Sequence, residues 1–317
     1  MTATEERPDP IFLVGAERSG TTLLRLMLDH HPEIAFFSEF EFAIERISDR
    51  GDFPDVGSYR EWLGNDRIFL DSGFLVDSEL DYPDLVRSFL DQKRDRDRKP
   101  LVGATVHAGF DRLVSIWPDA RYIHLLRDPR DVARSTIAMG WAGNVWTGVE
   151  RWLEAESTWS RMRDDLPRDR WVEIRYESLV QNPEDELQAI CNFLGVRYDA
   201  RMLAYPKGTT YPAPDPSVAS RWKQTLSEAE VGLVEHRLGS SLAECGYAPS
   251  GAPAVSVTPR MERRLYRQDR IARVRFRVHR YGLFLSAAEY LSRKLGLTVL
   301  HARVLHRMHD VTRRHLR

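Results

Sequence analysis

Short apolar runs alternate along the first 200 residues with segments whose apolar side chains recur every three or four positions. The runs at 11–14, 34–37 and 121–126 predict buried strands, because mostly apolar stretches of this length suit strands covered on both faces. The segments at 21–29 and 183–194 have the spacing of helices with one buried face. This alternation predicts an α/β fold with a central parallel sheet and helices on both faces.

Further elements extend the pattern. Residues 171–176 predict another strand, and residues 101–102 begin one. Helices are expected over 149–162 and from Pro129, because proline suits the first position of a helix. The run of mixed charges at 91–99 predicts a solvated loop. Since the carboxyl ends of parallel strands share one edge, polar residues that follow the strands should meet there.

The last part of the chain differs from the rest in charge. Residues 256–317 contain 16 Lys and Arg against 4 Asp and Glu, although the whole chain has a net charge of −1. We expect an α/β domain over 1–250 and a basic helical extension over 251–317. Such an asymmetry predicts electrostatic attachment, to the acidic body of the protein, to a second subunit of a homo-oligomer or to a membrane surface. Nucleic acid is not expected, because no binding module is recognised.

The chain has two cysteines, Cys191 and Cys245, which is too few for a disulfide framework. Its first ten residues are polar and acidic, without the basic and apolar regions of a signal peptide. No window approaches 18 consecutive apolar residues, the length of a membrane-spanning helix. These features predict a cytoplasmic protein.

The most informative segment follows the first strand. Gly15 and Gly20 bound a tight loop before a helix, an arrangement in which backbone amides and the helix N-terminus surround one anion. The spacing is that of a nucleotide P-loop, but Thr21 stands where the lysine of that loop should be. The loop therefore suits an anion that needs no metal. The candidate binding residues are Arg18, Ser19, Gly20, Thr21 and Thr22.

A second anion site is indicated at the end of another strand. Arg127 follows the strand at 121–126, and a guanidinium there can hold a phosphate with two parallel hydrogen bonds. Ser135 follows eight residues later, slightly more than two helical turns on, and therefore on the same side of the helix. The two residues could hold one phosphate between them.

Together, residues 11–22 and 122–135 resemble the 5′-phosphosulfate loop and the 3′-phosphate site of the sulfotransferase superfamily. That superfamily uses 3′-phosphoadenosine-5′-phosphosulfate (PAPS). Residues 171–179 resemble a third family segment, whose tyrosine, here Tyr176, lies by the adenosine. The segment around Arg221 resembles a late stretch that returns a basic residue to the cofactor. The run from 18 to 33 is most similar to the tyrosylprotein sulfotransferase branch and its bacterial relatives.

This resemblance implies a P-loop-like three-layer fold and the transfer of a sulfuryl group from PAPS to an acceptor hydroxyl. The acceptor is a sugar, a lipid, a small natural product or a peptide, and the product is adenosine 3′,5′-bisphosphate (PAP). No metal is required. Arg18 and the loop amides would stabilise charge on the transferring group and on the leaving phosphate.

The resemblance also assigns the catalytic base to Glu39, which follows the second strand. Glu41 is a neighbour that could be confused with it. Many relatives carry a lysine that contacts the leaving phosphate, and Ala104 stands at the corresponding position. His107 could replace that lysine, or could itself be the base. Glu17 places a carboxylate in the loop, and we expect its side chain to point outward.

Two other functions stay open at this point. A P-loop kinase or nucleotide hydrolase would use the same strand, loop and helix, although Thr21 lacks the amine that reaches the terminal phosphates. A non-catalytic nucleotide-binding module would be consistent with Ala104. Metal-dependent turnover of ATP would indicate the first alternative. Tight binding of PAP without transfer would indicate the second.

Overall fold

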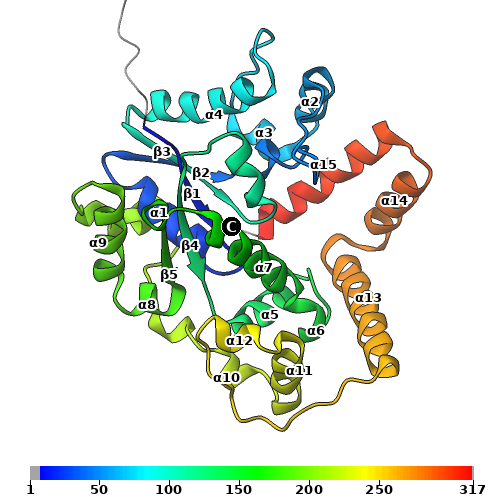
Figure 1. Cartoon of the computed structure of the whole chain (residues 1–317). Helices are drawn as coiled ribbons and strands as arrows, with labels where there is room; N and C mark the ends of the chain where they lie inside the picture. The colour runs from blue at the N-terminus through cyan, green and yellow to red at the C-terminus, as the bar shows by residue number, and fades with distance from the viewer. Residues whose placement is uncertain (1–7, 316–317) are drawn as a thin grey trace, which may run out of the picture. The chain divides into compact units, whose positions relative to one another are not determined.

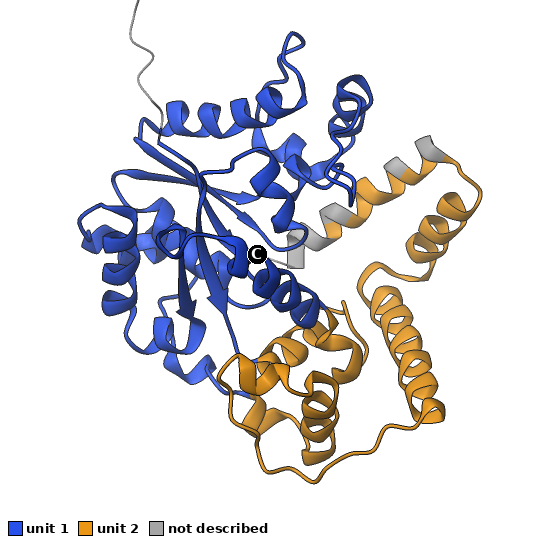
Figure 2. Ribbon diagram, viewed as in Figure 1, with its two compact units in different colours: residues 1–128, 151–221 blue, residues 129–150, 222–317 orange. Residues whose placement is uncertain are grey.

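The structure is a computed structural model that describes residues 8–315, with side chains left undescribed at 298, 299, 302, 309, 310 and 312–315. Its contacts divide the chain into two compact units (Figure 2). Unit 1 comprises the residues up to 128 together with 151–221. Unit 2 comprises 129–150 together with the residues from 222 onward.

Unit 1 is built on a five-stranded sheet in which every neighbouring pair of strands is parallel (Figure 1). The strand order is β2-β3-β1-β4-β5. The strands are β1 (Ile11–Val14), β2 (Ile34–Glu39), β3 (Leu101–Val106), β4 (Arg121–Leu126) and β5 (Trp171–Arg175). The parallel sheet predicted from the alternating pattern is therefore confirmed, and the segments that follow the strands meet at one edge.

Helices cover both faces of this sheet. They are α1 (Thr21–Asp29), α2 (Val56–Leu63), α3 (Arg67–Ser72), α4 (Tyr82–Asp97), α7 (Glu150–Asp165), α8 (Tyr176–Gln181) and α9 (Pro183–Leu194). On one face, Leu13 and Leu125 belong to an apolar core with residues of α1 and α9. On the other face, Phe12 packs against Trp117, and His124 stacks on Trp159 of α7. The predicted three-layer arrangement is confirmed.

One predicted loop is a helix instead. The charged run at 91–99 falls mostly within α4, which ends at Asp97. Lys93 is buried there and pairs with Asp29 at 3.2 Å and with Asp97 at 2.7 Å. The prediction was wrong because these ion pairs satisfy the charges along one side of the helix. A sequence pattern does not reveal the distant partner Asp29, although Asp97 lies only four residues from Lys93.

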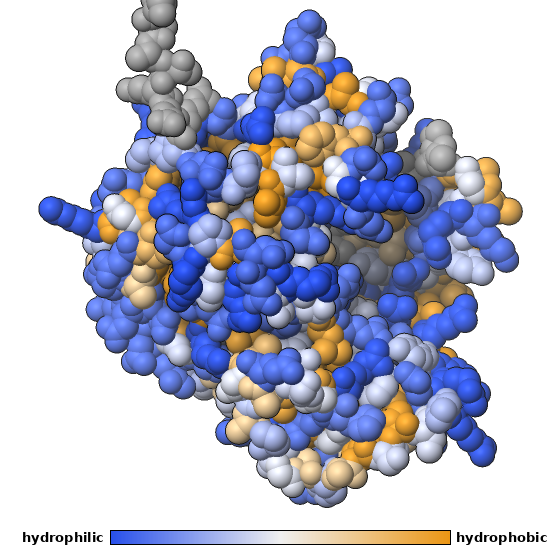
Figure 3. Space-filling view, viewed as in Figure 1, coloured by the Kyte–Doolittle hydropathy of each residue, from blue (hydrophilic) through white to orange (hydrophobic). Residues whose placement is uncertain are grey.

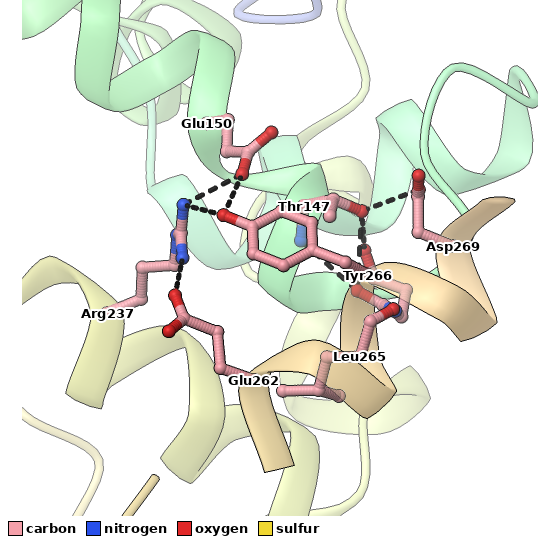
Figure 4. Close-up of polar contacts among 8 residues, drawn as sticks. Thr147, Glu150, Arg237, Glu262, Leu265, Tyr266 and Asp269 are labelled. Atoms are coloured by element: carbon pink, nitrogen blue, oxygen red, sulfur yellow. Dashed lines mark hydrogen bonds and ion pairs between the residues drawn. The ribbon is translucent and has the colours of Figure 1, made fainter. Parts of the chain in front are cut away.

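Unit 2 is helical. Its helices are α5 (Pro129–Ala138), α6 (Val145–Gly148), α10 (Trp222–Thr225), α11 (Glu228–Leu238), α12 (Ser241–Glu244), α13 (Pro259–Tyr281), α14 (Leu283–Lys294) and α15 (Thr298–His315). Asp269 of α13 is buried and accepts a hydrogen bond of 2.7 Å from the hydroxyl of Thr147 (Figure 4). It accepts another of 2.7 Å from the amide of Gly143. A buried carboxylate with these partners fixes α13 against α6.

A second group of contacts holds the same helix. Arg237 of α11 donates to Glu150 at 2.7 Å and lies 3.7 Å from Glu262, while the hydroxyl of Tyr266 lies 3.1 Å from both Arg237 and Glu150 (Figure 4). Residues 259–281 therefore pack with 129–150 and 222–248 in one unit. These contacts join distant segments within unit 2, and the division at residue 250 stays a prediction.

Most of the surface in view is hydrophilic, and the hydrophobic residues on it form small separate patches (Figure 3). None of the helices in the described part of the chain is both long and apolar enough to span a bilayer.

Candidate active site

The loop after β1 is shaped by two glycines that no other residue could replace without strain. Gly15 has φ +144°, and a Cβ atom there would lie 2.5 Å from the backbone oxygen of Leu125. Gly20 has φ +96°, and its Cβ would lie 2.2 Å from the ring of Tyr176. The glycine spacing read from the sequence therefore reflects two close approaches of neighbouring strands and helices to the loop.

Between these glycines the backbone turns back on itself. Arg18 has φ +70°, an uncommon conformation for a residue with a side chain. The amide of Ser19 bonds to the oxygen of Ala16 at 3.2 Å, and α1 begins two residues later at Thr21. Gly20 occupies the cap position and has no side chain to bond the first amides of α1. Amides at such a helix start are suited to bind an anion.

Arg127 reaches this loop from the end of β4. Its side chain is 8% exposed, and its Nη1 atom donates to the backbone oxygen of Arg18 at 3.0 Å. The guanidinium also lies 4.2 Å from the ring centroid of Tyr176, and Nη2 donates to the oxygen of Val218 at 3.4 Å. The Nε atom is buried and has no hydrogen-bond partner within residues 8–315. The two predicted anion sites thus meet in one place.

A cavity of about 190 Å³ lies where these groups meet. Its lining includes residues that the sequence predicted to bind the cofactor, and one segment that the sequence analysis did not assign to the site. The predicted residues in the lining are Arg18, Gly20, Thr21, Thr22, Arg127 and Tyr176. The additional segment is 211–215, together with Val218. A proline-rich stretch of this kind is typical of a loop, and only the folded chain shows which site the loop borders.

Two other predicted binding residues lie outside this lining. Ser135 is a half-buried residue of α5 and belongs to unit 2, so its pairing with Arg127 stays a prediction. Arg221 is exposed and follows Ser220, a second non-glycine residue with positive φ. Hydrogen bonds from Ser217 lower the pKa of Asp215 in the cavity lining, and the charge of Arg221 adds to that effect.

The two glutamates near the end of β2 have different surroundings. Glu39 is exposed at the carboxyl end of the strand, beside Thr105 of β3. Glu41 accepts a hydrogen bond from the amide of His107 at 2.7 Å, and burial raises the pKa of its carboxyl. A carboxylate at an open strand end can reach an acceptor, whereas Glu41 is bonded to the backbone amide of His107, just after β3. This contrast favours Glu39 over Glu41 as the base.

His107 contacts the loop directly. Its Nδ1 atom lies 3.2 Å from the backbone oxygen of Gly15. Ala104 is buried and faces the side of the sheet that carries Phe12, its partner in the strand register. Thr105 faces the opposite side, with Leu13. Ala104, at the position expected for the family lysine, supplies no positive charge. At the same end of the strand, His107 contacts the loop through Gly15.

The carboxylate in the loop has a specific partner. Glu17 forms an ion pair with Arg151 of α7. This pair counteracts the negative charge that Glu17 would otherwise place beside an anion site. Both side chains border a second cavity, together with His107.

A sequence profile described as the Sulfotransferase family matches residues 10–200 of the chain. The chain belongs to the sulfotransferase family. The match contains the loop, Glu39, Arg127, Ser135 and Tyr176. The resemblance to the PAPS-dependent superfamily is therefore confirmed, and the protein is a sulfotransferase that moves a sulfuryl group to an acceptor.

Curated relatives support the branch suggested by the sequence. Protein-tyrosine sulfotransferase 2 of Gallus gallus is 25% identical over 273 residues, which cover 77% of this sulfotransferase and 70% of the relative. Protein-tyrosine sulfotransferase 1 of Mus musculus is 24% identical over 272 residues, with the same coverage.

Solved structures support the fold. The sulfotransferase domain of the Synechococcus PCC 7002 olefin synthase aligns with a TM-score of 0.54 at 22% identity and covers 74% of this chain and 96% of that domain. The sulfotransferase domain of the curacin biosynthetic pathway aligns with a TM-score of 0.56 at 18% identity, over 76% of this chain and 98% of the domain.

The predicted cytoplasmic localisation is wrong. Curated relatives such as those of Gallus gallus and Drosophila melanogaster are named protein-tyrosine sulfotransferases, which are not cytoplasmic enzymes. The prediction failed because a low cysteine count says only that disulfides do not hold the fold together. A sulfotransferase whose core is the packed sheet of unit 1 needs no disulfides in any compartment.

Proposed function

We propose that the sulfuryl donor is PAPS, with its 5′-phosphosulfate bound by the loop at 15–20 and its 3′-phosphate bound by Arg127. The support is the hydrogen bond of 3.0 Å between Arg127 and the backbone of Arg18. It joins two anion-binding groups at one cavity, as a donor with phosphates on the 3′ and 5′ oxygens of one ribose requires.

The residues around this cavity fit such an anion. The Nε atom of Arg127 and the hydroxyl of Ser19 are buried, and neither has a hydrogen-bond partner in the described part of the chain. Buried polar atoms are normally paired, so each can donate to an oxygen of a bound group. The first amides of α1 offer further donors, because Gly20 cannot cap them.

The rest of the donor is assigned from the family resemblance. Ser135 would share the 3′-phosphate with Arg127. Tyr176 would lie by the adenosine, in keeping with its place in the cavity lining, and Arg221 would return to the cofactor. These assignments require no metal ion, since Arg127, Arg18 and the loop amides would supply the positive charge.

In the proposed reaction, an acceptor oxygen attacks the sulfur as the bond from sulfur to the bridging phosphate oxygen breaks. The acceptor proton passes to Glu39, and PAP leaves with the electron pair of the broken bond. Arg18 and the amides of residues 18–22 would stabilise the charge that develops on the leaving phosphate. The exposed carboxylate of Glu39 supports its role as base.

The acceptor is proposed to be a phenol. The names of the curated relatives support tyrosine-like acceptors, although sugar, lipid and other natural-product hydroxyls are tested beside them. Electrostatic attachment of α13 to a membrane surface or to a second subunit is a separate proposal, supported by its exposed arginines at 263, 267 and 270.

Calorimetric titration tests the donor assignment. PAP should bind the full-length protein, and adenosine 5′-monophosphate, which lacks the 3′-phosphate, should bind on the order of 100-fold more weakly. A chelator should not change either affinity. Equal affinities for the two nucleotides would reject the 3′-phosphate site. Transfer is then measured by mass spectrometry with PAPS and a panel of hydroxyl acceptors, with Arg18→Ala expected to abolish it.

A further inference from the structure

A second cavity of unit 1, also about 190 Å³, borders the phosphate-binding loop at Glu17. Residues 107–110 line it from the end of β3. Helix α7 contributes a stripe of residues spaced by three and four, which therefore lie on one face of the helix. These residues are Arg151, Glu154, Ala155 and Thr158. A molecule in this cavity would contact Glu17. The next residue, Arg18, is the one that we assign to the transferring group.

The charges around this cavity are unequal. Glu17 pairs with Arg151, so these two side chains offset each other. Glu154 is exposed, and no hydrogen bond or ion pair is seen for it among the described residues. The negative charge of Glu154 therefore has no ion-pair partner among the described residues at the cavity. The proposed donor beside the loop would add further negative charge to the same region.

We propose that this cavity receives the acceptor and selects phenols that carry a positive charge over phenols that carry a negative one. The inference rests on the proposed function, which supplies the donor and the transfer. A cation near Glu154 is attracted, and an anion is repelled by Glu154 and by the donor. Because Glu154 is exposed, solvent weakens the interaction, and the expected preference is on the order of tenfold in kcat/KM.

Three phenols of similar size test the selection in the full-length protein with saturating PAPS. They are 4-hydroxyphenethylamine, which is cationic, 4-hydroxyphenethyl alcohol, which is neutral, and 4-hydroxyphenylacetate, which is anionic. We expect kcat/KM to fall in that order. High salt should reduce the ratio between amine and acid, because screening weakens interactions between exposed charges.

Substitutions at Glu154 test the residue itself. Glu154→Gln should bring the ratio between amine and acid close to one, and Glu154→Lys should reverse it. Asp165→Asn is the matched control, because Asp165 is an exposed carboxylate of the same helix that does not line the cavity. The control should keep the ratio of the unmodified protein.

The outcomes distinguish failure of this inference from failure of the proposed function. Preference for the anionic phenol, or an unchanged ratio in Glu154→Gln, would overturn the inference. Binding of PAP without turnover of any of the three phenols would also overturn it, while leaving the donor site in place. Failure to bind PAP would reject the proposed function itself.

Discussion

The guanidinium of Arg127 donates a hydrogen bond of 3.0 Å to the backbone oxygen of Arg18, although the two residues are 109 positions apart in the chain. The contact crosses from the end of β4 to the loop after β1, two strands that are neighbours in the sheet. It holds the loop while leaving the buried Nε of Arg127 without a partner. One arginine can therefore order the loop and bind an anion.

Replacement of Arg127 by alanine should lower the affinity for PAP on the order of 100-fold and leave the affinity for adenosine 5′-monophosphate much less changed. Arg127→Lys should restore only part of the loss, since an ammonium cannot form two parallel bonds or stack in the same way on Tyr176. Calorimetry with both nucleotides measures these differences. Arg67→Ala removes an exposed arginine of α3 and serves as the control. An equal loss of affinity for both nucleotides would show that Arg127 orders the loop and does not bind the 3′-phosphate.

Gly20→Ala should strongly reduce PAP binding and destabilise the fold. The new Cβ would lie 2.2 Å from the ring of Tyr176, and the left-handed backbone at φ +96° adds strain. Gly51→Ala is a matched control, because Gly51 has φ +85° and no atom within 4 Å of its Cβ position. The control should cost only about 1 kcal/mol of unfolding free energy. Similar unfolding curves for Gly20→Ala and Gly51→Ala would show that the ring of Tyr176 moves to make room for the methyl group.

Glu39→Gln should reduce kcat by roughly 10²- to 10⁴-fold, the usual contribution of a general base, without weakening PAP binding. His107→Ala should affect PAP binding as well as rate, because the ring of His107 bonds to Gly15 of the loop. Steady-state kinetics and calorimetry on both variants separate the two roles. Near-normal turnover in Glu39→Gln would remove this residue from the mechanism and favour His107 as the base.

The stability of unit 1 should decrease at alkaline pH because of His124. Burial alone would lower the pKa of this histidine, but Glu156 and Glu173, which its two ring nitrogens contact, outweigh burial and raise the pKa to about 9. The folded-state pKa lies above the unfolded value, so this stabilisation is complete below about pH 6.5 and is lost as the pH rises through 9.

Denaturant unfolding at pH 7 and pH 10 measures this effect. The unmodified protein should lose roughly 2 kcal/mol of unfolding free energy from this group between the two values. Glu156→Gln removes one of the two carboxylates and should show a smaller loss. Tyrosines and lysines also titrate in this range, so the difference between the two proteins is the quantity that decides. An identical loss in both would contradict the assignment to His124.

The chain's local patterns were sufficient to predict the sheet, the loop and the helices α1, α5, α7 and α9. The apolar runs at 11–14, 34–37 and 121–126 lie in β1, β2 and β4, and Gly15 and Gly20 mark a loop that only glycines can form. Glu39 and Arg127 follow strands, and parallel strands bring their carboxyl ends to one edge. These inferences need only neighbouring residues and the general rules of parallel sheets.

The partners of these residues depended on the folded chain. The segment 211–215 borders the donor cavity, Glu41 bonds to the amide of His107, and Glu17 pairs with Arg151. The charged run at 91–99 became part of a helix through Lys93 and its acidic partners. Apart from the pair of Lys93 with Asp97 inside α4, each contact joins segments far apart in sequence. Periodicity and motif spacing describe one stretch at a time, so only packing in three dimensions decides which stretches meet.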